Sequence, residues 1–89
     1  MASSSVIDQV STRLDAWLVR MREETASYGP DASAFVSAAE ATLRGGKRLR
    51  ARFCHAGWAS VAGLQGIDQE PAALWDACAA LEVFQSAAL

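Results

Sequence analysis

Basic residues are concentrated in one short stretch of an acidic chain. The segment ATLRGGKRLRARF, residues 41–53, holds five of the eight Lys and Arg residues of a protein whose formal net charge is −2. Two adjacent glycines allow a ligand to come close to the backbone, and Lys47 and Arg50 follow them. A lysine ammonium and a fork-shaped guanidinium both bind phosphate oxygens well. Three interpretations are open for this segment: a diphosphate site, a nucleic-acid contact, or a solvated helix start.

The expected position of these charges at the beginning of a helix favours a bound anion. A helix is predicted to begin near Lys47, which would place Lys47 and Arg50 on one face, with Arg48 and Arg52 pointing elsewhere, towards solvent. Cations at a helix N-terminus oppose the helix dipole by about 0.3–1 kcal/mol each. A bound anion would reverse that effect, and the unpaired N–H groups of the first turn would help to bind it.

A second group of polar residues lies on the last predicted helix. Glu82, Gln85 and Ser86 are three and four residues apart, so they share a helical face with Cys78 and Leu89 in an otherwise apolar segment. A buried polar group without a hydrogen-bond partner costs about 1–3 kcal/mol. Pairing with another helix is the more common solution for such groups, and a ligand is the alternative.

Several other chemistries do not fit the sequence. A nucleotide-binding loop of the Walker type needs glycine where Ala41 stands and Ser or Thr where Arg48 stands. Cys54, His55 and Cys78 lack the short spacings typical of metal sites, so His55 is expected to be a core or interface residue. No Ser-His-Asp arrangement is evident.

A helix-turn-helix DNA-binding domain is a further alternative, because a glycine turn joins two helices and the second is basic at its start. However, that helix continues as FCHAGWASVAG, which offers few side chains that could reach base edges. The net charge of −2 also argues against a general binder of polyanions.

The elements that must position these residues are helices. The chain is 52% apolar, mostly alanine, and contains two prolines, so an all-α fold is predicted. Helical periodicity and the Gly and Pro breaks predict four helices: residues 4–27, 32–44, 47–63 and 70–89. The packing positions expected on the first helix are Ile7, Val10, Leu14, Trp17, Leu18 and Met21, and those on the second are Phe35, Ala39, Thr42 and Leu43.

The fourth predicted helix is apolar on almost every side, which is typical of a helix at the centre of a larger bundle. We therefore expect residues 1–89 to form a single segment, which is the front part of a longer helical protein. Within it, residues 1–30 would form the first helix and turn, and residues 31–89 would carry the motifs. No signal peptide or membrane span is predicted, and the two cysteines are expected to be reduced, so a cytoplasmic location is expected.

Two motifs together resemble the trans-type polyprenyl diphosphate synthase family. These are GGKRLR at residues 45–50 and LEVFQSAAL at residues 81–89, about 35 residues apart with a helix between them. The resemblance covers residues 35–89, whereas residues 1–34 match only as a generic first helix. It implies an all-helical isoprenoid-synthase bundle and a prenyltransferase that condenses isopentenyl diphosphate with an allylic diphosphate.

The resemblance also implies roles for particular residues. Lys47, Arg50 and Gln85 would bind the diphosphate of isopentenyl diphosphate, and Gly46 would shape its approach. The Mg²⁺ ligands of such enzymes come from an aspartate-rich DDxxD motif, which would begin two helical turns beyond Gln85 and therefore after Leu89. The 89 residues alone are therefore expected to lack transferase activity, and the whole enzyme is expected to be a homodimer. A stand-alone helical interaction module is the alternative.

One residue departs from the family pattern within the first motif. Ala51 stands where such enzymes usually have proline, and Arg52 follows it. Alanine continues a helix without harm. This difference is expected to change the start of the helix more than the chemistry of the site.

Overall fold

The computed structural model describes residues 2–44 and 47–88. Over those residues the chain forms four α-helices and one short 3-10 helix, which confirms the predicted all-α fold of about four helices. Their bounds are α1 Ala2–Thr25, η1 Ala26–Tyr28, α2 Pro30–Leu43, α3 Leu49–Leu64 and α4 Ala72–Ala88. Each predicted helix is thus present, with ends that differ by a few residues.

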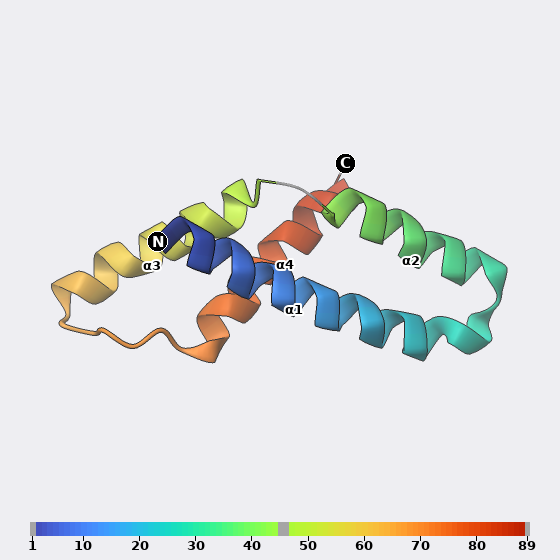
Figure 1. Cartoon of the computed structure of the whole chain (residues 1–89), viewed down its shortest axis with the longest axis horizontal. Helices are drawn as coiled ribbons and strands as arrows, with labels where there is room; N and C mark the ends of the chain where they lie inside the picture. Colours follow the sequence, from blue (N-terminus) through green and yellow to red (C-terminus); the bar gives the residue numbers. More distant parts are fainter. Residues whose placement is uncertain (1, 45–46, 89) are drawn as a thin grey trace.

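The first two helices form an antiparallel hairpin (Figure 1). Gly29 makes the turn with φ = 102°, a backbone angle that glycine adopts without strain, and Pro30 is the first residue of α2. Gly29 occupies the cap position of α2, and Asp31 lies in its first turn. Pro30 is favourable there because the first N–H groups of a helix have no partner within it.

The face of α1 that packs into the core agrees with the predicted apolar stripe except at its start, where Val6 is buried and the predicted Ile7 is only partly buried. Val10 and Leu14 are completely buried, and Leu18 is nearly so. The packing face predicted for α2 is partly wrong, because Phe35 is 76% exposed whereas its neighbour Val36 is buried. Adjacent residues of a helix point about 100° apart, so a prediction that is one residue off exchanges a core position for a surface position.

Helix α4 crosses α1 and contacts all three other helices, while α3 lies beside α4 and the first half of α1 (Figure 1). The molecule measures 49 × 21 × 21 Å and has a radius of gyration of 14.8 Å. A compact chain of this length would have a radius of about 12 Å. The four helices therefore bury only one side of α4: Trp75 and Cys78 are buried, whereas Phe84 is 72% exposed.

The segment between α3 and α4 is attached to α3 through His55. The Nε2 atom of His55 lies 2.6 Å from a carboxylate oxygen of Glu70, and its ring stacks on Trp75 with the centroids 5.3 Å apart. His55 is thus a half-buried residue at the contact between two helices, as expected. Neither Cys54 nor Cys78 forms a disulfide, and no helix among the described residues is both long and apolar enough to cross a bilayer.

Candidate functional site

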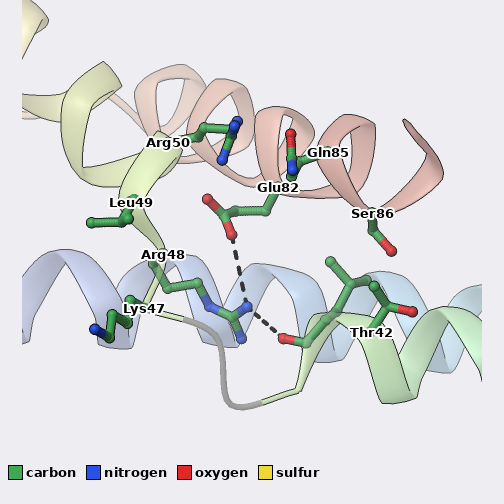
Figure 2. Close-up of a pocket in the computed structure, with 9 residues that line it drawn as sticks. Thr42, Lys47, Arg48, Leu49, Arg50, Glu82, Gln85 and Ser86 are labelled. Carbon is green, nitrogen blue, oxygen red and sulfur yellow. Dashed lines mark hydrogen bonds and ion pairs between the residues drawn. The ribbon is translucent and has the colours of Figure 1, made fainter. Parts of the chain in front are cut away.

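A pocket of about 290 Å³ lies where the end of α2, the start of α3 and the last turns of α4 meet (Figure 2). Most of the residues that line it are polar or charged; the lining comprises Thr42, Leu43, Lys47, Arg48, Leu49, Arg50, Glu82, Gln85 and Ser86. The basic segment and the polar face of α4 therefore meet at one place, although 35 residues separate Arg50 from Gln85 in the sequence.

Three of the four residues predicted to bind the ligand line this pocket. Arg50, in the first turn of α3, and Gln85, on α4, contribute a guanidinium and an amide. Lys47 precedes α3 and is exposed, and Figure 2 shows its side chain extending away from Glu82 and Gln85. Gly46, the fourth predicted residue, lies outside the described residues.

The start of α3 differs from the prediction in a way that changes the role of Arg48. The helix begins at Leu49 instead of near Lys47, and Arg48 occupies its cap position in the left-handed conformation, with φ = 56°. In this conformation the Arg48 side chain turns inward. The expectation that Arg48 faces solvent is wrong, because the side chain is only 9% exposed.

Arg48 connects the end of α2 to α4. One guanidinium nitrogen, Nη1, donates a hydrogen bond to the Leu43 carbonyl oxygen, one of the last carbonyls of α2. The same nitrogen lies 3.9 Å from Oε1 of Glu82, which is 12% exposed. The Nε atom of Arg48 is buried and has no hydrogen-bond partner among the described residues. Arg48 is therefore a buried cation that is paired but incompletely hydrogen-bonded.

Glu82 also acts on the start of α3. Its Oε2 atom accepts a hydrogen bond of 3.1 Å from the backbone N–H of Ala51, which is one of the N–H groups that a helix start leaves unpaired. A carboxylate at this position is stabilised by the helix dipole. The protein itself thus places one negative charge, that of Glu82, at the basic helix start, although Glu82 is 31 positions away from Ala51.

The polar residues of α4 have two different surroundings: one is bonded to α3, and the other two line the pocket. Glu82 bonds to Ala51 of α3 and pairs with Arg48 at the start of that helix, so pairing with another helix satisfies this polar residue. Gln85 and Ser86 are half-buried and line the pocket, opposite Thr42 at the end of α2 (Figure 2). The amide and the hydroxyl leave donors and acceptors available to a ligand on this side.

Cys78, which precedes Glu82 by one turn of α4, has a weakly reactive thiol. Burial, and then a hydrogen bond with Cys54, raise the pKa of the Cys78 thiol from 9.0 to about 12. A neutral thiol is a poor metal ligand and a poor nucleophile. No group of three or more His, Cys, Asp or Glu side chains among the described residues is placed to hold a metal ion.

Neither a family model, nor a curated protein, nor a solved structure matches this chain.

Proposed function

We propose that the pocket binds the diphosphate group of isopentenyl diphosphate, and that the chain belongs to a prenyltransferase that joins isopentenyl diphosphate to an allylic diphosphate. The observation that carries this proposal is the convergence of Lys47, Arg50 and Gln85 on one pocket. The pairing of the GGKRLR and LEVFQSAAL motifs in the sequence supports the same function. Assembly of the whole enzyme as a homodimer is part of the proposal.

The chemistry of the pocket suits a small polyvalent anion. The Arg50 guanidinium can bind two phosphate oxygens at once, and the Gln85 amide can donate to a third. The backbone N–H groups of Leu49 and Arg50, in the first turn of α3, have no acceptor within their own helix. The flexible four-carbon chain of Lys47 can rotate its ammonium towards a bound anion. The pocket that these residues line has a volume near the lower limit for small-ligand sites.

The role proposed for the described residues is binding and orientation. They would hold the diphosphate at the end of the pocket and thereby fix the isopentenyl double bond relative to an allylic partner.

A stand-alone helical interaction module is the second candidate. Leu81 and Phe84 lie three residues apart on α4, and both are exposed. Exposed apolar side chains on one helical face are common at contacts with another helix. This candidate predicts association of the chain without any specific binding of phosphates.

Ligand binding by single variants distinguishes these functions. We expect the wild-type chain to bind isopentenyl diphosphate and pyrophosphate in calorimetry. Loss of one charge-assisted contact costs about 1.5–3 kcal/mol, so Lys47→Ala and Arg50→Ala should each bind about 10-fold to 100-fold more weakly. Arg52→Ala is the matched control, because Arg52 does not line the pocket.

Two results would contradict the proposal. Equal losses in all three variants, together with a steep salt dependence of DNA binding, would indicate a nucleic-acid contact. Self-association without phosphate binding would indicate the interaction module.

A further inference from the structure

The side chain of Glu82 occupies the place where an anionic ligand would be most strongly attracted. Its carboxylate accepts the Ala51 N–H at the amino end of α3 and faces the Arg48 guanidinium (Figure 2). Both Glu82 and Arg48 line the same pocket as Arg50 and Gln85. A phosphate group entering this pocket therefore meets a negative charge of the protein itself.

The charges around the pocket show how much Glu82 matters. Among the described residues, three cations line it, Lys47, Arg48 and Arg50, and Glu82 is the one carboxylate. The formal charge of these lining residues is +2 with Glu82 and would be +3 without its charge. Like charges within one pocket repel by an amount that exceeds thermal energy when they are only partly solvated.

The pairing of Glu82 with Arg48 is also loose enough to be exchanged. The closest distance between the two groups is 3.9 Å, longer than a direct hydrogen bond. The buried Nε atom of Arg48 lacks a partner among the described residues. A ligand oxygen could therefore form a closer hydrogen bond with Arg48 than Glu82 does, provided that the ligand carries enough charge to replace the carboxylate.

We propose that Glu82 is an internal competitor of the ligand, which holds the start of α3 and Arg48 in the empty pocket and gives way to a polyvalent phosphate. This inference rests on the proposed function of the pocket as a diphosphate site. Glu82 sets the selectivity of the pocket: a diphosphate has the charge to replace the carboxylate, whereas a monophosphate ester has less and binds poorly. Removing the charge of Glu82 thus strengthens binding, which is the opposite of what simple damage to the site would do.

The test compares pyrophosphate and methyl phosphate binding to the whole chain in metal-free buffer, using calorimetry. Glu82→Gln keeps the size of the side chain and an oxygen that can accept the Ala51 N–H. We expect it to bind pyrophosphate about fivefold or more tightly than wild type, since one like charge has left the pocket. Methyl phosphate, which has too little charge to replace the carboxylate in wild type, should gain by a larger factor than pyrophosphate, so that the ratio of the two affinities falls. Glu24→Gln, the same charge change at an exposed position of α1, should change neither affinity.

The four outcomes separate this inference from the proposed function. Pyrophosphate binding by wild type and tighter binding by Glu82→Gln support both. Binding by wild type that is equal or weaker in Glu82→Gln keeps the diphosphate site and overturns the competitor. Binding by Glu82→Gln alone supports the competitor and contradicts the diphosphate function of the wild-type pocket. No binding by either protein overturns both.

Glu82→Asp provides a second variant if Glu82→Gln does not fold. The shorter side chain keeps the charge that compensates Arg48 but withdraws it from the Ala51 N–H. Tighter pyrophosphate binding by Glu82→Asp than by wild type supports the competitor, and equal or weaker binding overturns it.

Discussion

Replacing Arg48 by methionine tests whether this buried cation holds three helices together. The side chain is about nine-tenths buried, donates to the Leu43 carbonyl at the end of α2, and faces Glu82 on α4. Methionine fills a similar volume without charge, so the change leaves the Leu43 carbonyl and the Glu82 carboxylate without their partner. Removing one member of a buried ion pair costs about 3–5 kcal/mol.

The expected loss lies at the lower end of that range. Glu82 keeps its hydrogen bond from Ala51, and the 3.9 Å separation shows that the original pair is not a tight one. We therefore expect Arg48→Met to lower the free energy of unfolding by about 3 kcal/mol. A domain of this length has a total stability of about 4–13 kcal/mol, and each kcal/mol shifts its melting temperature by about 4–8 °C. The melting temperature should thus fall by about 12–24 °C.

Urea unfolding followed by circular dichroism measures this change, with the denaturant slope compared between variants to confirm two-state behaviour. Arg50→Met is the matched control: the same substitution two residues away at an exposed position should stay within about 0.5 kcal/mol of wild type. Combining Arg48→Met with Glu82→Gln should cost less than the sum of the single changes, because each removes the other's partner. A loss below about 1 kcal/mol in Arg48→Met, with Arg50→Met unchanged, would refute the role assigned to Arg48.

Two further predictions follow from shifted pKa values. The pKa of Cys78 is about 12 instead of 9.0, so at pH 8 its thiolate population is about a thousandfold smaller than that of a thiol with the ordinary pKa. Iodoacetamide should therefore modify Cys54 before Cys78, and mass spectrometry of the digested protein measures this order. The raised pKa also means that the neutral Cys78 thiol stabilises the fold below pH 9, and that this contribution is lost as the pH rises from 9 towards 12; early alkylation of Cys78 would contradict both points. A hydrogen bond from Arg22, followed by the charges of Arg22 and Arg44, lowers the pKa of Glu40 below 4.5. The stability that Glu40 contributes is therefore present above pH 4.5 and lost below it, so the difference in stability between wild type and Glu40→Gln should shrink as the pH falls through that range, and a constant difference would contradict the pairing.

Much of the fold could be predicted because it depends on local properties of the sequence. The apolar stripe containing Val10 and Leu14 repeats with helical spacing, and the breaks at Gly29 and Pro30 mark a turn wherever the helices pack. The shared face of Glu82 and Gln85 followed from the same spacing. These features need no knowledge of which helix lies against which.

The inward position of Arg48 could not be predicted, because it depends on where α3 begins. A start at Leu49 instead of Lys47 removes two residues from the helix, and each residue changes the direction of a side chain by about 100°. Nothing in the types of Arg48 and Arg50 shows which one adopts the left-handed conformation. The inward side chain follows from the packing of α2 and α4 against this turn, which the spacing of residues does not record.

The bond between Glu82 and Ala51 changes what the basic segment implies about a ligand. Cations at a helix start suggested an external anion, but the fold already places a carboxylate there. The position of the charges therefore says less about a ligand than their number does.

One carboxylate neutralises one of the three cations in the pocket lining, and Lys47 and Arg50 remain as surplus charge on its solvent-exposed side. A surplus kept beside an internal anion costs stability through the repulsion of like charges, and a bound polyvalent anion would offset that cost. The ligand hypothesis therefore rests on the uncompensated charges of Lys47 and Arg50, and measuring the stability of the chain with and without pyrophosphate tests it directly.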